Sequence, residues 1–568
     1  MCGIIAFFDL LKKYQGNPEK LKERLTVLGN LMRTRGPDSQ GYHGGKYFGM
    51  AHQRLAIMDP LHGDQPFVYE EQGYALVANG EIYNFQELIS KHNLPQMQTH
   101  SDCEPLIALY DKLGNDMVKE LNGMFGFVIS KNGGEEIYAA RDHCGIKPLY
   151  IGYGKEGEIW FSSELKGIVN EDCEKIEEFP AGHYWTRSEG FRRYYQPAWD
   201  HDDFEPKGDC SKIKKVLEQA VRDQCMSDQP FGLLLSGGLD SACIAVLLKP
   251  IMQELGEEFH TFSVGMEGSP DITAARMMSK FLGTTHHEHL FNADEAFEHV
   301  EKVIYHLETY EPELIRSAIP NYFLARMTSQ YVKMVLTGEG SDELFGGYLY
   351  FRDAPDSRTF HRELRRIFHH LHNVNCQRAD RMTMAHALEA RVPFLCPNVI
   401  EAIMNIDPSF KTITKERPAE KHALRAAFEG TMPSEVLWRT KAMQCEGIGM
   451  TWVAELQSRC NRQISDEEFA RRDELYPINT PVTKEEMYYR KIFEKYYKGM
   501  DKFVQVWDGG CRAGGAAWKT TAYTREGLRD VKQLAKGLGI DTNHVDEHSE
   551  KLANFHGKDS LGDNTIQT

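Results

Sequence analysis

One short stretch of the chain constrains its fold more than any other. Residues 231–235 are apolar and β-prone, Ser236-Gly-Gly-Leu-Asp-Ser241 follows directly, and Ala242 to Leu248 suits a helix. A strand, a glycine turn and a helix in this order are typical of an α/β domain with a parallel sheet. Because Gly237 and Gly238 lack a Cβ, the backbone can approach a ligand closely, and the positive end of the helix favours an anion. The stretch therefore predicts a phosphate-binding loop.

The side chains of this loop indicate a nucleotide held together with a metal ion. Ser236 and Ser241 offer hydroxyl donors, whereas Asp240 is better suited to hold Mg²⁺ than to face a phosphate directly. The spacing fits neither a Walker loop nor Gly-x-Gly-x-x-Gly. It resembles the loop of the ATP pyrophosphatases. These enzymes cleave ATP between the α and β phosphates, adenylate a substrate and release pyrophosphate. The alternative is an ordinary glycine turn between a strand and a helix. The ATP-binding residues predicted here are Leu235, Ser236, Gly237, Gly238, Asp240 and Ser241.

Composition narrows the class of protein. The 568 residues are too many for one hydrophobic core and predict two or three domains. The formal charge of −17 disfavours binding to nucleic acid or to an anionic membrane. Apolar runs are shorter than the roughly 18 residues of a membrane span, no signal peptide is recognisable, and the 12 cysteines are scattered without a Cys-x-x-Cys pair. We expect a cytoplasmic protein with reduced thiols and neither a disulfide framework nor a zinc site.

Cys2 is the cysteine with the most unusual position. If Met1 is removed, Cys2 carries a thiol and a free α-amino group, whose pKa of about 7.7 to 8 leaves much of it unprotonated near neutrality. Such an amine can act as the base for the adjacent thiol, so that nucleophile and base share one residue. A structural cysteine at position 2 is the alternative, and the clusters that follow favour the nucleophile.

Polar clusters at the ends of short predicted strands fill the first part of the chain. Each cluster alone is more often a turn or a surface ion pair, although glycine turns at strand ends are also where site residues are placed. Together with Met1-Cys-Gly-Ile4 they resemble the class II glutamine amidotransferase domain, which has the α+β N-terminal-nucleophile fold with αββα layers. The clusters that carry this resemblance are Arg35-Gly-Pro-Asp38, His52 to Asp59, Asn79 to Asn84, Ser101 to Glu104 and Arg141 to Tyr150.

The resemblance assigns a role to each matching position. It implies that Cys2 attacks the side-chain amide of glutamine, with Asn79 and the Gly80 N–H as the oxyanion hole. Arg54 has the planar fork that suits the substrate α-carboxylate. His100 stands where the pattern has glycine. The glutamine-binding residues implied in this way are Arg54, Leu55, Ala56, Ile57, Met58, Asn79, Gly80, Glu81 and Asp102, of which Glu81 and Asp102 would hold the α-ammonium.

A second chemical stretch, Lys333 to Gly347, is an apolar strand that ends in glycines, a serine and three carboxylates. We expect Asp342 to share the metal with Asp240, and Glu339 to orient an acyl-adenylate or to act as base for the incoming amine. Lys421 is the predicted cation on the ATP phosphates. An acidic loop of other purpose and a solvated helix lysine are the alternatives. Val264, Thr337 and Gly338 complete the predicted ATP site, with Val264 packed on adenine.

Both halves, in this order, resemble the glutamine-hydrolysing asparagine synthetases of the bacterial B type. Arg381 to His386, Glu389 to Leu395 and Glu420 to Arg425 add to the resemblance. It implies a homodimer that converts aspartate, ATP and glutamine, with Mg²⁺, through β-aspartyl-AMP into asparagine, AMP, pyrophosphate and glutamate. It also implies a sealed passage for ammonia, because free ammonia would be protonated and lost as a nucleophile. Thr337, Ala387, Cys396 and Met443 depart from the family pattern.

The predicted organisation has four parts. Residues 1–195 form the glutaminase domain, 196–210 a linker, 211–508 an α/β ATP-pyrophosphatase domain with a parallel sheet, and 509–568 a largely disordered tail. Ser211 is the predicted N-cap of the first helix of the second domain.

Two other functions stay open at this point. One is a related enzyme that adenylates a different carboxylate acceptor, such as a β-lactam synthetase, which needs no glutamine. The other is a non-catalytic paralogue that only senses glutamine or nucleotide. Intact Cys2 with Arg54, Asn79 and Asp102 argues against the first alternative. Intact Asp240, Asp342 and Cys2 argue against the second. The histidine runs 286–289 and 369–372 lack the His-Glu-x-x-His spacing of a metal site and are interpreted as packed or solvated.

Overall fold

The computed structural model describes residues 2–12, 16–439, 451–504 and 518. Its N-terminal part contains two antiparallel six-stranded sheets. The first has the order β10-β8-β9-β1-β3-β2, with β1 Gly3–Asp9, β2 Ser39–Gly44, β3 Phe48–Arg54, β8 Tyr150–Gly154, β9 Glu158–Ser162 and β10 Cys173–Glu178. The second has the order β12-β11-β7-β6-β5-β4, with β4 Phe67–Tyr69, β5 Tyr74–Ile82, β6 Gly123–Lys131, β7 Glu136–Arg141, β11 His183–Thr186 and β12 Gly190–Arg193.

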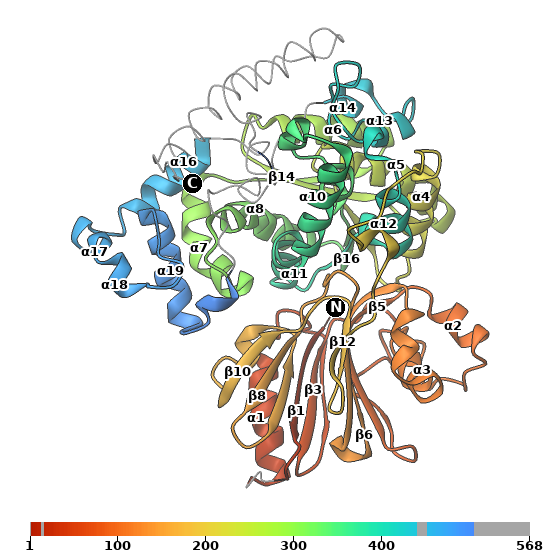
Figure 1. Ribbon diagram of the computed structural model, residues 1–568, viewed down its shortest axis with the longest axis vertical. Coiled ribbons are helices and arrows are strands. Elements are labelled where there is room, and N and C mark those ends of the chain that lie inside the picture. The colour runs from red at the N-terminus through yellow and green to blue at the C-terminus, as the bar shows by residue number, and fades with distance from the viewer. Residues whose placement is uncertain (1, 13–15, 440–450, 505–517, 519–568) are drawn as a thin grey trace.

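The two sheets lie face to face between helical layers (Figure 1). Helix α1 (Pro18–Asn30) covers the outer face of the first sheet, and α2 (Phe85–Lys91) and α3 (Pro105–Leu113) lie against the second. Side chains along β1 alternate between the two faces of the first sheet, which explains this layering. Ile4, Ala6 and Phe8 face the core between the sheets. Ile5 and Phe7 pack with α1. The predicted αββα fold is confirmed.

The C-terminal part is built on one parallel sheet of order β15-β14-β13-β16-β17. Its strands are β13 Phe231–Leu234, β14 His260–Gly265, β15 Thr285–Leu290, β16 Met334–Leu336 and β17 Glu389–Arg391. The central strand β13 has no polar face, and Leu233 is fully buried, as expected of a sheet covered on both sides. The predicted α/β domain with a parallel sheet is confirmed.

Helices surround this sheet and extend beyond it (Figure 1). They are α4 Ile213–Asp223, α5 Leu239–Leu255, α6 Pro270–Leu282, α7 Ala293–Leu307, α8 Pro312–Thr328, α9 Ser341–Phe345, α10 Ser357–His369, α11 Asn375–Met384, α12 Pro397–Met404, α13 His422–Ala427, α14 Ser434–Leu437, α16 Thr451–Asn461, α17 Asp466–Ala470, α18 Arg472–Leu475 and α19 Lys484–Tyr496. Ser211 does not cap α4, because Lys212 occupies the N-cap and the Ser211 hydroxyl donates to Asp209 instead.

The predicted linker, residues 196–210, is packed against the second domain. Trp199 is fully buried and lies edge-on to Phe368 of α10. Asp200 pairs with His369 and Arg365. The predicted disordered tail lies outside the described residues, except for Trp518, whose indole N–H donates to the Tyr350 carbonyl oxygen at 3.1 Å.

Buried ion pairs join the two domains. Arg35, which is fully buried, donates to Asp380 of α11 at 2.8 and 3.2 Å and to Glu164 at 2.9 Å. Arg381, beside Asp380, lies 3.2 Å from Glu164 and 3.0 Å from Glu308. Opposite charges alternate throughout this cluster, which is the condition for burying them without a large desolvation penalty. The cluster fixes α11 against the first domain.

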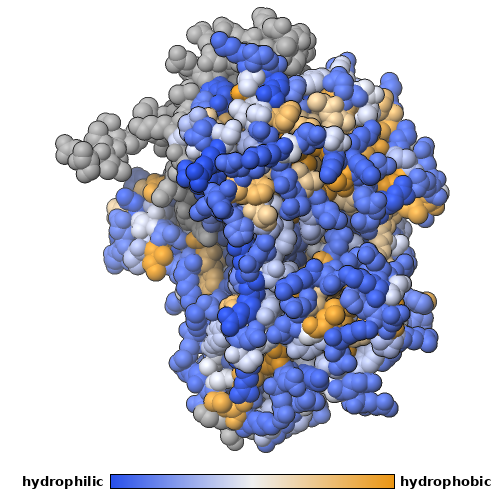
Figure 2. All heavy atoms as spheres, turned by 45° about the vertical axis from the view of Figure 1, so that its right-hand side comes forward, coloured by the Kyte–Doolittle hydropathy of each residue, from blue (hydrophilic) through white to orange (hydrophobic). Residues whose placement is uncertain are grey.

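The surface is largely polar on the face that Figure 2 shows, where hydrophobic residues lie in small separate groups. Across the part of the chain that the structure describes, no helix combines the length and the apolar character that crossing a membrane requires.

Replacing Arg35 by methionine should destabilise the protein strongly. The change removes the positive charge that balances the buried carboxylates of Asp380 and Glu164. Removing one partner of a buried ion pair lowers the free energy of unfolding by about 3–5 kcal/mol. The thermal unfolding midpoint of Arg35→Met should fall by many degrees. Lys12→Met, which breaks the exposed Lys12–Glu135 pair, should leave the midpoint nearly unchanged. Equal midpoints for the two variants would contradict this account of the interface.

Candidate active sites

Cys2 lies at the start of β1, at the boundary between the domains. Its backbone nitrogen donates to Asn79 Oδ1 at 2.9 Å, and its carbonyl oxygen accepts from Arg35 Nε at 2.9 Å. The register pairs Gly3 with Gln53, so Cys2 reaches the end of β3, where the Leu55 N–H points at the thiol. Burial raises the pKa of the Cys2 thiol. The thiol therefore needs a base close by to become a nucleophile.

Asn79 of β5 brings its side-chain amide to Cys2, and Gly80, the other residue of the predicted oxyanion hole, follows it on the strand. Asn79 is fully buried, and its Nδ2 has no partner within the described part of the chain, although its Oδ1 is bonded to Cys2. Gly80 has a φ of +154°, and a Cβ there would lie 2.0 Å from the Met124 carbonyl oxygen, so only glycine fits. An unpartnered amide donor next to a buried thiol suits an oxygen that gains negative charge.

Arg54 ends β3 and is held by the loop that follows it. Its guanidinium donates to Asp64 at 2.7 Å and to the carbonyl oxygens of Met58 and Asp59 at 3.0 and 2.6 Å. The Asp38 carboxylate accepts from the Ala56 N–H at 2.8 Å and so fixes the segment 55–58. The structure thus brings Arg54 and this segment next to Cys2, while their binding of a substrate stays a prediction.

Glu81 and Asp102 lie near a buried arginine from the other domain. Arg391 of β17 is 3.1 Å from Glu81 and 2.6 Å from Glu389, so two carboxylates share one guanidinium. Burial, followed by Glu389 and Asp102, raises the pKa of Glu81 well above its usual value. Burial also raises the pKa of Asp102 to about 6. Glu81 therefore forms an ion pair across the domain boundary, which the sequence did not predict. Its contact with glutamine stays a prediction.

His100, the residue that replaces glycine in the family pattern, is exposed. Its backbone N–H donates to Asp59 at 2.9 Å, which ties the loop 98–101 to the segment that follows β3. The exposed position explains how a bulky side chain is accommodated at this point of the loop.

The predicted phosphate loop lies between β13 and α5. Gly237 has a φ of +74°, and a Cβ there would lie 2.5 Å from the Ala275 N atom of α6. The hydroxyls of Ser236 and Ser241 are 3.1 Å apart, and Gly238 is the N-cap of α5. The Leu235 N–H donates to Phe262 at 2.7 Å, which continues the sheet into the loop. The loop has the shape that the glycines predicted, with the helix start directed at the same place as the two serines.

Asp240, Asp342 and Lys421 meet beside this loop. Lys421 Nζ lies 2.6 Å from an Asp240 oxygen and 2.7 Å from an Asp342 oxygen. Two glycines allow the approach, because a Cβ on Gly338 would lie 2.8 Å from Asp240 Cβ, and one on Gly347 would lie 2.1 Å from Asp342 Oδ1. Residues far apart in the sequence thus form one charged cluster, while their binding of a metal ion and of phosphate stays a prediction.

The cluster has the donors that a hard divalent cation prefers. Both aspartates present oxygens to one cationic position, and carboxylates at the end of a phosphate loop are typical ligands of Mg²⁺ in nucleotide sites. The residues present therefore fit the predicted ion. Thr337 is buried and donates its N–H to the Arg391 carbonyl oxygen at 3.0 Å, and Val264 on β14 is 8% exposed. Both lie at the carboxyl ends of parallel strands, where ligands bind in such sheets.

Two arginines that sequence reasoning missed lie in this region. Arg378 of α11 donates to Glu339 at 2.7 Å, so the candidate base is paired with a cation. Arg439 donates to the Gly237 carbonyl oxygen at 3.2 Å and to Asp271 at 2.5 Å, and so clamps the phosphate loop. The run Trp438-Arg-Thr-Lys441 was the only sequence signal for Arg439. Lys441 and the departure at Met443 lie outside the described residues.

Two departures from the family pattern have visible consequences. Ala387 has a φ of +54°, a left-handed conformation that glycine adopts without strain and that costs alanine about 1 kcal/mol. Cys396 is buried at the N-cap of α12, and its Sγ lies 3.6 Å from Asn122 Oδ1 of the first domain. The cysteine therefore belongs to the domain boundary, whereas nothing in the structure explains Thr337 in place of serine.

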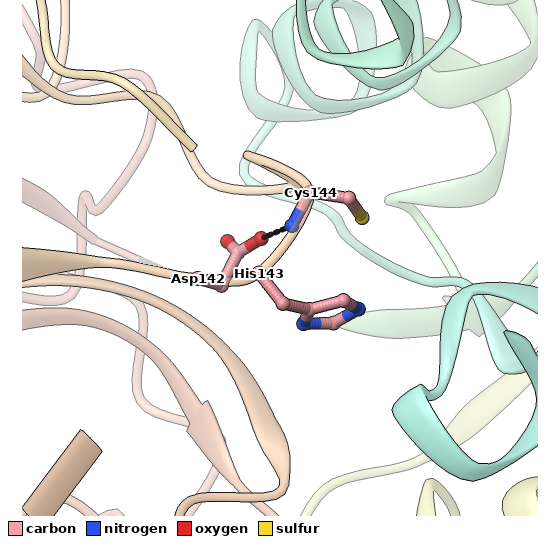
Figure 3. A group of neighbouring side chains, drawn as sticks. All are labelled: Asp142, His143 and Cys144. Atoms are coloured by element: carbon pink, nitrogen blue, oxygen red, sulfur yellow. Dashed lines mark hydrogen bonds between the residues drawn. The ribbon is translucent and has the colours of Figure 1, made fainter. Parts of the chain in front are cut away.

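Three potential metal ligands also meet in the turn after β7, namely Asp142, His143 and Cys144 (Figure 3). The Asp142 carboxylate accepts backbone N–H groups from Phe125, Cys144, Ile146 and Lys147, and His143 Nε2 is bonded to Leu395 O at 2.7 Å. These hydrogen bonds engage the Asp142 carboxylate and the His143 ring in stabilising a tight turn, so we assign these two side chains a structural role.

The histidine runs are engaged in packing and hydrogen bonds, as predicted. His286 is bonded to Thr261 and Ser263 of the neighbouring strand at 2.9 and 3.1 Å, and His287 to His260 at 3.2 Å. His372 is bonded to Glu178 at 2.8 Å.

Comparison with known proteins gives matches over both parts of the chain. The asparagine synthase family model matches residues 212–359 and 352–513, and the glutamine amidotransferase domain model matches residues 1–193. A Dictyostelium discoideum protein described as a probable glutamine-hydrolysing asparagine synthetase is 40% identical over 566 residues, covering 93% of this chain and 100% of the relative. A glutamine-hydrolysing asparagine synthetase 2 of Oryza sativa subsp. japonica is 42% identical over 512 residues, covering 88% of this chain and 86% of the relative.

A solved structure described as the allosteric regulatory enzyme of purine biosynthesis is 16% identical, with a TM-score of 0.29, over 51% of this chain and 80% of its own. A likeness this low supports no inference about the chain. The αββα fold, the position-2 thiol and the α/β domain behind it define a two-domain glutamine amidotransferase. More closely, the chain belongs to the asparagine synthase family.

Replacing Lys421 by methionine should make stability depend on divalent cations. Without the lysine, the Asp240 and Asp342 carboxylates lose the cation between them and repel each other. We expect the thermal midpoint of Lys421→Met to lie several degrees below that of the parent at pH 8.

Millimolar Mg²⁺ should raise the midpoint of this variant at pH 8, because a bound cation replaces the lysine charge. The matched control is Lys495→Met, which removes an exposed lysine paired with Glu301 and whose midpoint should not respond to Mg²⁺. A Lys421→Met midpoint that Mg²⁺ does not move would contradict the metal assignment.

Proposed function

We propose that this chain synthesises asparagine from aspartate and ATP, with ammonia released from glutamine at Cys2. AMP, pyrophosphate and glutamate are the other products, and β-aspartyl-AMP is the intermediate. The observation that carries the proposal is the combination of a buried thiol beside an unpartnered amide donor with a two-aspartate phosphate site in one chain. Membership of the asparagine synthase family supports the same function.

In the first domain, Cys2 is the proposed nucleophile towards the glutamine amide. Once Met1 is removed, the α-amino group of Cys2 would remain bonded to Asn79 Oδ1, which orients it as a base beside its own thiol. Asn79 Nδ2 and the Gly80 N–H stabilise the negative oxygen of the tetrahedral intermediate. Arg54 and the segment from Leu55 to Met58 bind the substrate carboxylate end, and Asp102 with Glu81 binds its ammonium group.

In the second domain, the loop from Leu235 to Ser241 binds the ATP phosphates with Thr337, Gly338 and Lys421, and Val264 packs on adenine. Asp240 and Asp342 would hold Mg²⁺, and a bound ion would supply positive charge against the departing pyrophosphate. Lys421 would then leave the two aspartates and pair with phosphate oxygens. Glu339, oriented by Arg378, positions the acyl-adenylate or takes a proton from the attacking ammonia.

An apolar core that crosses the domain boundary supports a sealed path for ammonia. Leu55, Ile57 and Met124 near the glutaminase site share one buried cluster with Leu235 and Leu395 of the synthetase side. Apolar walls keep ammonia unprotonated, and hence nucleophilic, on its way. We infer that ammonia passes through this cluster.

The remaining parts of the proposal rest on the family resemblance. We propose domain boundaries at residues 1–195, 196–210, 211–508 and 509–568, in line with the matched ranges 1–193 and 212–513. A homodimer and a cytoplasmic location belong to the same proposal.

Product analysis tests the function directly. Purified protein with ATP, Mg²⁺, aspartate and glutamine should release pyrophosphate and asparagine in equal amounts, and chelation of Mg²⁺ should stop both. Cys2→Ala should lose glutamine-dependent synthesis at least 10³-fold, yet keep synthesis from added ammonium, because the thiol is not part of the second site. Chromatography of products follows both reactions.

Asp240→Asn serves as the opposite control and should lose both reactions while it still hydrolyses glutamine. If the parent protein forms glutamate but no aspartate-dependent pyrophosphate, the acceptor is a different carboxylate. If Cys2→Ala still hydrolyses glutamine at the parent rate, the nucleophile assignment is wrong.

The affinity for glutamine should depend on the ionisation of Asp102. Burial raises the pKa of this carboxyl to about 6, so it is ionised at pH 7.5 and becomes neutral as the pH falls through 6. Only the ionised form pairs with the substrate ammonium. The KM for glutamine, measured from glutamate release, should therefore rise about tenfold per pH unit below pH 6.

Asp102→Asn should show a raised KM with no such dependence on pH. A parent KM that stays constant between pH 7.5 and pH 5 would show that Asp102 does not bind the ammonium group.

A further inference from the structure

Trp518 is the residue beyond Val504 that the structure describes, and it lies on the second domain. Its indole N–H donates to the Tyr350 carbonyl oxygen at 3.1 Å. The centroid of its ring system lies 5.8 Å from that of Tyr350 and 6.0 Å from that of Phe351. Both of these partners are buried, so the indole packs on the hydrophobic core of the domain. Trp518 has no part in the mechanism proposed above.

One connection runs from the indole to the first turn of α9. Tyr350 stacks on Tyr348, with ring planes 10° apart and centroids separated by 6.2 Å. The Tyr348 hydroxyl donates to the buried carboxylate of Glu343, which follows Asp342 in α9. The side-chain amide of Asn375 donates to the same carboxylate at 2.8 Å. A displacement of Tyr350 therefore acts on the residue next to the proposed metal ligand.

A second connection runs from the indole to the end of α9. Phe351 packs on Phe360 of α10, with 4.7 Å between the ring centroids. Phe360 in turn lies against Gly346, the C-cap of α9, where a Cβ would come within 2.5 Å of the Phe360 ring. The Gly347 N–H closes this end of the helix by donating to the Asp342 carbonyl oxygen at 2.9 Å. Aromatic side chains thus support both ends of the helix that carries Asp342.

Helix α9 depends on such support. It has five residues, and a helix this short is not stable through its own hydrogen bonds. Because Asp342 lies in its first turn, a shift of the helix moves one of the two proposed Mg²⁺ ligands relative to Asp240 and Lys421. Mg²⁺ requires near-ideal octahedral geometry and is therefore sensitive to such a shift.

We propose that Trp518 is a positioning residue for the end of the second site that binds the metal ion and pyrophosphate. Its indole completes an aromatic cluster that holds α9, and hence Asp342, in place. The cluster consists of Tyr348, Tyr350, Phe351 and Phe360. The inference rests on the proposed function for the identity of the ligand, ATP with Mg²⁺, whereas the support of α9 is a property of the chain alone.

Hydrogen exchange and nucleotide binding test the proposal on the full chain. Trp518→Ala should raise the amide exchange rate of residues 341–351, because α9 loses its support. In calorimetric titrations with ATP and Mg²⁺ but without aspartate, the Kd for ATP should rise about tenfold, as expected for the loss of one hydrogen bond and two ring contacts. Glutamate release from glutamine should stay at the parent rate, because Trp518 does not contact the first domain's site.

Trp518→Phe is the matched variant. It keeps an aromatic ring on the cluster but cannot donate the hydrogen bond, so its Kd for ATP should lie between those of the parent and Trp518→Ala. Tyr331→Ala is the control for the loss of an aromatic side chain elsewhere in the domain. Tyr331 is 47% exposed and packs on His287 of β15, so this variant should match the parent in both measurements.

Equal exchange of residues 341–351 in the parent and in Trp518→Ala would overturn the proposal. Faster exchange with an unchanged Kd for ATP would also overturn it, because the indole would then serve stability only. If the variants differ as expected but the parent forms no asparagine, the positioning role is supported and the proposed function fails instead. Should Trp518→Ala not fold, the comparison of Trp518→Phe with the parent decides by the same criteria.

Discussion

Arg35 occupies the place on which the relation between the two domains depends. Its fully buried guanidinium is bonded to the carbonyl oxygen of Cys2, to Glu164 and to Asp380. A cation in the interior is stable only while these partners stay in contact with it, so the boundary is closed by charge and not by apolar packing alone. Helix α11, which supplies Asp380, is thereby fixed relative to Cys2, and the same helix holds Glu339 through Arg378. One rigid helix thus spans the distance between two chemical sites.

Charge also organises the second site, but in a form that a ligand can rearrange. Lys421 is held at a φ of +56°, a strained conformation for a lysine, with its ammonium group between Asp240 and Asp342. The two aspartates are 18% and 15% exposed, whereas the carboxylates around Arg35 are nearly fully buried. The proposed Mg²⁺ would reach these two carboxylates from solvent, although the Lys421 side chain itself is buried. The carboxylates of the two charged clusters therefore differ in their burial.

Much of the fold and of both candidate sites could be predicted from the sequence, because the relevant signals are local. The run from Phe231 to Leu248 encodes strand, glycine turn and helix within one stretch, and alternation along β1 encodes a strand between two packed faces. Cys2 is chemically distinctive by its position alone. The convergence of Asp240, Asp342 and Lys421 was predicted from family resemblance, since no spacing in the chain relates three residues this far apart.

What only the tertiary structure decided is which groups become partners across the domain boundary. Glu81 meets Arg391, and Cys396 meets Asn122, although neither spacing nor composition pairs them. The sequence by itself determined the two domain folds, because backbone conformation and hydrophobic alternation depend on neighbouring residues. It also predicted Cys2 as the nucleophile and residues 235–241 as the phosphate loop. Ionisation depends instead on burial and on charges brought close by folding, which are properties of the assembled interior.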